Sequence, residues 1–255
     1  MHVITRKRLI KFAQRHADAG APLHTWYRAL KAERFTSPET LRAVFPTARF
    51  LGQGLTIFNM AGNKYRLVAT VRYATATNLG RVWIREIFTH TEYDRWSDER
   101  RRGPYPVAEP SQLRFAQRER DVMAERMQRL DLSTPHVLRT EQEYDAAVAE
   151  IDALLDQDAA PETPEGDRLE LLTLLVQAYD EEHYPLGDTV TPQAVVDFLL
   201  EQQGMSRAAL SPILGGRSRV SEFFAGKRRL SISQIQGLRQ LLHVSADLLL
   251  EPVPT

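Results

Sequence analysis

The sequence contains no cysteine. Disulfide bonds, thiolate nucleophiles and metal sites built on cysteine are therefore excluded. It also has no run of about 18 apolar residues, the length that a helix needs to cross a bilayer. Residues 1–8 lack the apolar stretch of a secretory signal. We therefore expect a cytoplasmic protein that has no contact with a membrane.

The chain as a whole also has no net charge, but its basic and acidic residues are unevenly distributed along the sequence. The 33 Lys and Arg residues balance 33 Asp and Glu residues. Residues 1–102 hold 19 basic and 8 acidic side chains, whereas residues 123–189 hold 4 and 17. A basic domain attracts nucleic acid, and an acidic neighbour attracts the basic domain. The alternative is that surface charge varies between domains without function.

Length and composition favour more than one domain. At 255 residues, with 43% hydrophobic and 26% charged residues, the chain is typical of a globular protein of about two domains. We expect a basic domain at 1–102, a linker at 103–122, an acidic helical segment at 123–189 and a C-terminal domain at 190–255. The stretch that begins at Met123 resembles the N-terminus of a second protein, which favours a fusion of two normally separate proteins.

The basic domain is predicted to be an α+β fold. The spacing of apolar residues predicts helices over residues 6–16, from Pro22 onward and over residues 38–45. Period-two alternation then predicts strands within residues 49–60, 64–73 and 81–89. We expect an antiparallel sheet with helices on one side.

One predicted strand carries three cations on one face. Lys64, Arg66 and Arg72 alternate with Tyr65, Leu67, Ala69, Val71 and Tyr73 on the opposite face. A basic sheet face can hold a phosphate backbone. The alternative is that these three side chains are simply solvated on a half-exposed sheet.

Several separated motifs resemble the HigB toxin family. They are Phe58 and Asn59, residues 62–67 (Gly-Asn-Lys-Tyr-Arg-Leu) and residues 89–94 (Thr-His-Thr-Glu-Tyr-Asp). Residues 3–7, Trp26 with Tyr27, and Phe45 with Pro46 fit the same pattern. HigB toxins are RelE-like endoribonucleases that cut messenger RNA, typically on the translating ribosome.

The resemblance implies cleavage without a metal or another cofactor, in which the 2′-OH of the RNA attacks the adjacent phosphate. It implies Lys64 and Arg66 as stabilisers of the anionic transition state, and His90 and Tyr93 as groups for proton transfer or base stacking. The further candidates for RNA contact are Asn63, Arg72 and Arg85. Asn63 has an alternative as a turn residue and Tyr93 as an aromatic cover of the sheet. The general acid and the general base are not assigned.

The acidic segment is predicted to contain two amphipathic helices, over residues 140–155 and 167–183. Its carboxylates either form a docking surface for the basic domain or only keep the helices soluble.

The C-terminal domain is predicted to consist of short helices over residues 192–203, 207–214, 218–225 and 232–243, with another after Ser245. Thr191 is expected to cap the first of these helices, and Ser231 to begin a capping box at the start of the fourth. A glycine turn between the second and the third helix is typical of a helix-turn-helix. Residues 216–228 resemble XRE/Cro-type repressors and, among them, the HigA antitoxins. The alternative is a helical bundle that does not bind DNA.

The third helix of this domain would carry the contacts to operator DNA. Its apolar residues, Val220, Phe223 and Phe224, are expected to face inward. The candidates for DNA contact are Ser206, Arg207, Arg217, Ser218, Arg219, Ser221, Glu222, Lys227 and Arg228.

The sequence is therefore interpreted as a HigB-like toxin fused to its HigA-like antitoxin. The expected partners are messenger RNA and the ribosome for the toxin, and operator DNA for the antitoxin, which binds as a dimer and represses its own operon. The antitoxin is expected to inhibit the toxin within the chain or across a homodimer. The alternatives are a transcriptional repressor whose sheet domain binds a ligand, and an RNA-binding regulator without cleavage.

Overall fold

The computed structural model describes residues 1–101, 136–187 and 190–250. The chain divides into two compact units, Met1–Ile87 with Leu186–Thr255, and Phe88–Pro185. The predicted linker, residues 103–122, lies outside the described residues, as does Met123. Each unit is described by itself.

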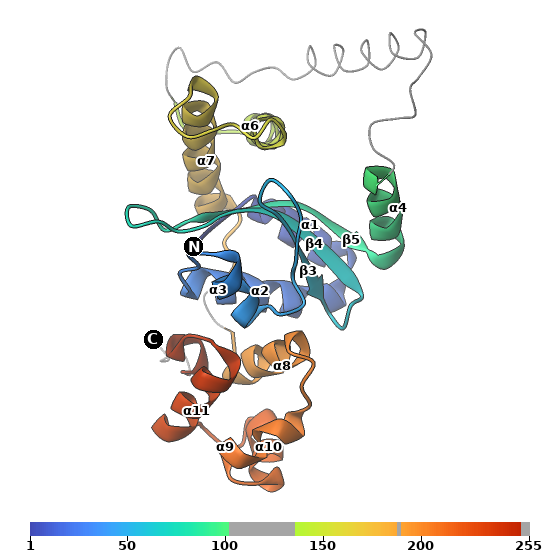
Figure 1. The fold of residues 1–255 in the computed structure, drawn as a ribbon, viewed down its shortest axis with the longest axis vertical. Coiled ribbons are helices and arrows are strands. Elements are labelled where there is room, and N and C mark those ends of the chain that lie inside the picture. Colours follow the sequence, from blue (N-terminus) through green and yellow to red (C-terminus); the bar gives the residue numbers. More distant parts are fainter. Residues whose placement is uncertain (102–135, 188–189, 251–255) are drawn as a thin grey trace. The chain divides into compact units, whose positions relative to one another are not determined.

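The sheet contains five strands: β1 (His2–Ile4), β2 (Arg49–Phe50), β3 (Leu55–Met60), β4 (Tyr65–Arg72) and β5 (Arg81–Thr89) (Figure 1). Their order is β1-β5-β4-β3-β2. The β2–β3 and β3–β4 pairs are antiparallel, but β1 pairs with β5 in parallel. The sheet is therefore mixed: the predicted antiparallel pairing is confirmed for β2–β3 and β3–β4, and the prediction of a wholly antiparallel sheet was wrong at β1. Alternation identifies a strand but not the direction of its neighbour, which depends on the path of the chain between them.

Three helices and a short 3-10 turn pack on one face of the sheet: α1 (Arg6–Arg15), η1 (Ala17–Ala19), α2 (Gly20–Ala32) and α3 (Pro38–Val44). The helix expected to open at Pro22 begins at Gly20 instead, because the turn of η1 leads directly into it. Ser37 and Thr40 form a capping box that starts α3. In the core, the Phe58 ring lies 5.3 Å from the rings of both Trp26 and Phe45.

The alternation predicted for β4 is present. Tyr65, Leu67, Ala69 and Val71 are buried and belong to the core shared with the helices. On the other face, Val68 and Thr70 are only 1% and 5% exposed. Arg66 and Arg72, which share that face, are half-buried. The cations of β4 therefore flank a buried middle, and the face is not uniformly solvated.

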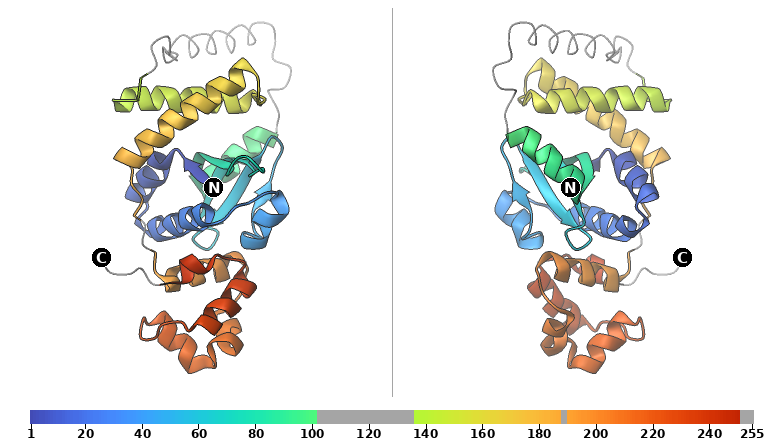
Figure 2. Two further views of the ribbon diagram at one scale, coloured as in Figure 1. Left: turned by 90° about the vertical axis from the view of Figure 1, so that its left-hand side faces the viewer. Right: turned by 90° about the vertical axis from the view of Figure 1, so that its right-hand side faces the viewer.

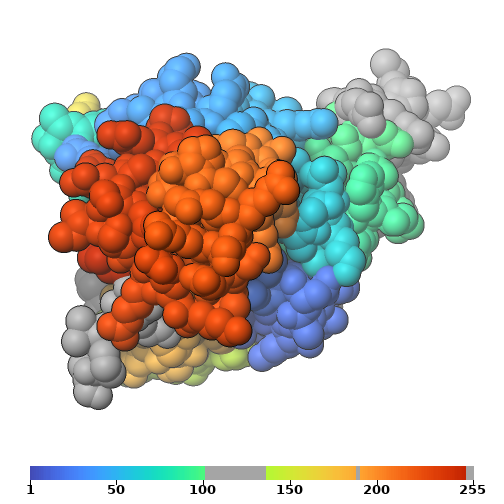
Figure 3. Space-filling view, turned by 90° about the horizontal axis from the view of Figure 1, so that it is seen from below, coloured from blue at the N-terminus to red at the C-terminus, as the bar shows by residue number. Residues whose placement is uncertain are grey.

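The C-terminal part of the first unit is helical throughout its described residues. It contains α8 (Pro192–Gln202), η2 (Arg207–Leu210), α9 (Ser211–Leu214), α10 (Arg217–Phe224), α11 (Ile232–Leu242) and η3 (Ala246–Leu249). Figure 3 shows the surface of these helices in orange to red. Thr191 caps α8 and Ser231 starts α11 with a capping box, as the sequence predicted. The helix expected over residues 207–214 is divided into η2 and α9, because Pro212 has no amide hydrogen to donate within a helix.

Helix α8 packs on α2, so that one hydrophobic core runs through the sheet, its helices and the C-terminal helices. The ring of Phe198 in α8 also lies 6.4 Å from the ring of Phe45, which follows α3.

The second unit contains α4 (His90–Arg101), α6 (Glu141–Asp156) and α7 (Pro164–His183). Figure 2 shows α6 and α7 as a pair of packed helices. Inside this pair, the Tyr144 hydroxyl donates to Asp180 at 2.9 Å, and Arg168 donates to both carboxylate oxygens of Glu150 at 2.9 Å. The sequence did not predict α4, because its residues lack an apolar stripe. None of the described helices combines the length and the apolar character that a membrane span requires.

Candidate functional site

The β3–β4 connection is a tight turn at residues 61–64. Ala61, Gly62 and Asn63 all have a positive φ, of 49°, 62° and 69°, and the Lys64 amide donates to the Ala61 carbonyl at 3.1 Å. Glycine and asparagine adopt this left-handed conformation most readily. Asn63 is therefore a turn residue, and its contact with RNA stays a prediction.

Lys64 lies at the end of this turn and forms an ion pair with Asp18 of η1. The other Asp18 oxygen, Oδ1, accepts a hydrogen bond from the Tyr65 hydroxyl at 2.7 Å. The hydrogen bond from Lys64 lowers the pKa of Asp18, and the same bond raises the pKa of Lys64. Both side chains are well exposed, 63% for Lys64 and 48% for Asp18, so the pair holds Lys64 in place without removing it from solvent.

Arg66 is the first outward residue of β4. Its Nη1 donates to two backbone carbonyls, of Asn63 at 2.7 Å and of Tyr65 at 3.1 Å. These bonds fold the guanidinium back over the turn. Lys64 and Arg66 thus place two cations at one end of the β3–β4 hairpin.

Arg72 and Arg85 lie farther along the sheet. The Arg72 guanidinium is 5.6 Å from the centre of the Trp83 ring, and Arg85 Nη1 donates to the Thr70 hydroxyl at 3.4 Å. Both cations are half-exposed and are held by neighbouring strands.

His90 and Tyr93 lie in the first turns of α4, which belongs to the second unit. His90 Nδ1 is 2.9 Å from Asp94 Oδ2, and the His90 side chain is 59% exposed. Tyr93 is only 9% exposed, and its ring centre lies 5.7 Å from that of Trp96. Asn63, Lys64 and Arg66 thus lie together in one hairpin of the first unit. His90 and Tyr93 belong to the second unit.

The candidates for DNA contact surround α10. Arg217, Ser218, Arg219, Ser221, Lys227 and Arg228 are exposed, whereas Val220 and Phe223 are buried. Glu222 accepts from the Ser218 hydroxyl at 3.3 Å and lies 3.7 Å from an Arg228 nitrogen. A β-carbon on Gly215 would meet Arg219 Nη1 at 2.6 Å, so Arg219 lies close to the backbone of the turn before α10.

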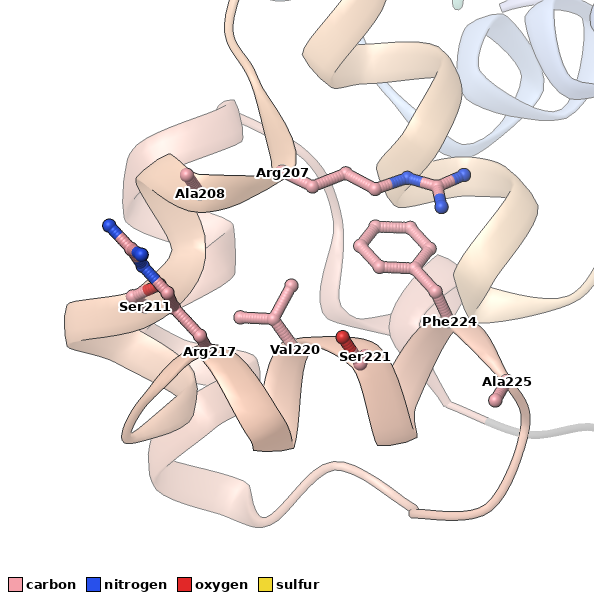
Figure 4. A pocket seen from close by; sticks show the side chains of 8 residues that line it. All are labelled: Arg207, Ala208, Ser211, Arg217, Val220, Ser221, Phe224 and Ala225. Atoms are coloured by element: carbon pink, nitrogen blue, oxygen red, sulfur yellow. The ribbon is translucent and has the colours of Figure 1, made fainter.

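A hollow of about 500 Å³ separates α10 from η2 and α9 (Figure 4). Arg207 covers one end of it, with its guanidinium 4.0 Å from the centre of the Phe224 ring. Asp197 Oδ1 accepts from Arg207 Nε at 2.8 Å, and this bond raises the pKa of Arg207. Phe224 was expected to face inward but is only half-buried: it packs at the edge of the core, and its ring also contacts this guanidinium. Ser206 occupies the N-cap position of η2, with no hydrogen bond from its side chain to the helix.

Two carboxylates at the β3–β4 turn, those of Asp18 and Glu201, were not predicted from the sequence. Asp18 lies 46 residues before Lys64, and Glu201 lies 139 residues after Gly62, whose amide donates to its Oε1. No local pattern connects residues at such separations. Among the described residues, no group of three His, Asp or Glu side chains is placed to hold a metal ion.

Comparison with known proteins gives the class of the first domain. Residues 19–96 match a family model described as HigB_toxin, the RelE-like toxic component of a toxin–antitoxin system. The "mRNA interferase toxin HigB" of Escherichia coli (strain K12) is 34% identical over 97 residues, which cover 37% of this chain and 88% of that protein. The "mRNA interferase HigB" of Shigella flexneri matches equally well. That of Escherichia coli O6:H1 is 26% identical over 98 residues, which cover 37% of this chain and 90% of that protein.

The first domain is therefore a RelE-like toxin domain of a toxin–antitoxin system. Within that class, the chain belongs to the HigB toxin family through residues 19–96.

Proposed function

We propose that the HigB domain of this chain is an endoribonuclease that cleaves messenger RNA on the ribosome, and that the rest of the chain is a HigA-like antitoxin that inhibits it. The observation that carries the cleavage proposal is the β3–β4 hairpin. It places Lys64 and Arg66 at one end of a hairpin, in a domain whose relatives are named mRNA interferases.

The proposed reaction uses the RNA as its own nucleophile. The 2′-OH attacks the adjacent phosphorus, and the bond from phosphorus to the 5′ oxygen breaks. Negative charge builds up on the non-bridging oxygens, where the Lys64 ammonium and the Arg66 guanidinium stabilise it. His90 and Tyr93 are proposed to transfer the proton or to stack on a base. Asn63, Arg72 and Arg85 are proposed to contact the RNA backbone.

The antitoxin proposal has its support in the C-terminal helices. Helix α8 packs on the toxin domain through Phe198 and Phe45, so a helical domain is attached to the toxin within one core. Exposed cations lie at the start of α10 and after its end. Their positions support a helix-turn-helix in which this helix would read a groove and the cations after it would contact phosphates. We propose that this domain binds operator DNA as a dimer and represses its own operon. Docking of the acidic helices on the toxin is part of the same proposal.

Expression in growing cells tests the cleavage proposal. Induction of residues 1–102 should stop growth and produce cuts in translated messenger RNA, because the inhibiting residues are missing. The complete chain, at the same level, should leave growth and messenger RNA unchanged. Intact messenger RNA after induction of folded 1–102 would contradict the proposal and favour a sheet domain that only binds RNA or a ligand.

A further inference from the structure

We propose that the β3–β4 turn is a binding site for a phosphate oxygen and that Glu201 of α8 occupies this site within the chain. The identity of the ligand as an RNA phosphate rests on the function proposed above. The anion site itself does not depend on cleavage.

The Gly62 amide is the centre of the site. It lies in the turn, between two other residues of positive φ, and it donates to Glu201 Oε1 at 2.5 Å. Turn backbones can form small concave sites for anions, and here the amide that donates to the carboxylate is that of Gly62. The oxygen at this site belongs to a carboxylate, which carries the same kind of charged acceptor as a phosphate.

The charges around Gly62 also favour an anion. Lys64 and Arg66 follow within four residues, and the Lys64 ammonium already holds a second carboxylate, from Asp18. Two carboxylates from distant parts of the chain therefore meet the donors of a single turn. An RNA phosphate would bring the same charge to these donors.

Glu201 is held at the turn by its neighbour in α8. The Gln202 side chain is 2% exposed, its Nε2 donates to the Asn59 carbonyl at 3.0 Å, and its Oε1 accepts from the Thr47 hydroxyl at 3.0 Å. Both ends of the buried amide thus bind the toxin domain. This anchor fixes the end of α8 beside the turn and makes Glu201 a local competitor of any anion that approaches Gly62.

The experiment follows the Gly62 amide in the complete chain by ¹⁵N NMR. The probes are inorganic phosphate and a short RNA whose 2′ oxygens are methylated, so that it binds without being cleaved. The variants are Glu201→Ala, which removes the carboxylate, and Glu201→Gln, which keeps the shape and an acceptor but removes the charge. Glu39→Gln, at an exposed position of α3, removes the same charge elsewhere and is the matched control.

We expect both probes to shift the Gly62 signal at concentrations lower by about tenfold or more in Glu201→Ala than in the parent, the effect of removing one competing charge-assisted hydrogen bond. The concentration needed for Glu201→Gln should lie between those for the parent and for Glu201→Ala, and Glu39→Gln should match the parent. Glu201 is exposed, and a melting curve of each variant verifies that it folds.

A Gly62 signal that responds equally in the parent and in both Glu201 variants would overturn the proposal, as would no response in any of them. Either result, together with a lower melting temperature of Glu201→Ala, would mean that Glu201 only fastens α8 to the toxin. A response as expected in a protein whose toxin domain never cuts RNA would support the anion site and contradict the proposed cleavage.

Discussion

Lys64 illustrates how a single cation of this chain is held at the end of the β3–β4 hairpin. Asp18 keeps the ammonium at the hairpin while most of its side chain stays in solvent. Arg66 is oriented by two backbone carbonyls instead. The two cations therefore differ in what holds them, and their variants should differ in stability although both lose cleavage.

Replacing Lys64 or Arg66 by alanine in residues 1–102 should remove most messenger RNA cleavage. Each change should cost about 2–4 kcal/mol of transition-state stabilisation, the scale of losing one preorganised donor. Cleavage rates on translating ribosomes and thermal melting measure the two effects, with Lys11→Ala at an exposed position of α1 as the control. Undiminished cleavage in both folded variants would falsify this assignment.

Asp18 should make the stability of the protein depend on pH in a defined direction, and Asp18→Asn should remove that dependence. Because folding lowers the pKa of Asp18, its contribution is present above the ordinary carboxyl pKa of about 4 and is lost as the pH falls through the lower folded value. Denaturant unfolding of parent and variant at several pH values checks this. The variant should be slightly less stable near neutral pH, and the difference should disappear in acid. A difference that persists unchanged in acid would show that the charge of Asp18 is not its cause.

Among the residues of the site, those with a local signal could be predicted from the sequence. Gly62 and Asn63 are turn formers in their immediate context, and the alternation of β4 identified its inner and outer faces. Asp18 and Glu201 could not be predicted, because their partners lie far away in the sequence and meet them only after folding.

At the scale of elements, N-cap residues predicted where two of the C-terminal helices begin. Thr191 and Ser231 predicted the starts of α8 and α11, and both side chains accept the expected backbone hydrogen bonds. Helix α4 was missed, because its residues are mostly charged and lack an apolar stripe. The parallel pairing of β1 with β5 was missed because it joins segments about 80 residues apart, and strand patterns carry no direction.

Helix α10 and the cations after it should play separable roles on DNA. Arg219→Ala should cost about 1–3 kcal/mol and relax the preference at one base pair per half-site, if its side chain reads a base edge. Lys227→Ala should weaken binding to all sequences and make its salt dependence shallower. Footprinting titrations of both variants on the promoter of the gene distinguish these effects. An unchanged sequence preference in Arg219→Ala would move base reading to Arg217, Ser218 or Glu222.

At the scale of the whole molecule, the charge distribution should control how quickly the two halves meet. Separately produced residues 1–102 and 123–255 should associate at a rate that falls steeply as salt rises, because opposite net charges steer the encounter. Dissociation should change less, since the contact of Phe198 with Phe45 is apolar. Stopped-flow mixing at several salt concentrations measures both rates. An association rate that does not change with salt would show that the uneven charge distribution does not serve to bring the two halves together.

Inhibition of the toxin by the rest of the chain is the central claim, and one titration tests it most directly. Residues 1–102 are allowed to cleave messenger RNA on translating ribosomes while residues 123–255 are added stepwise. Cleavage should be strong at the start and should disappear when about one equivalent has been added, as expected for tight binding of one antitoxin to one toxin. Cleavage that continues unchanged in excess of residues 123–255 would contradict the claim.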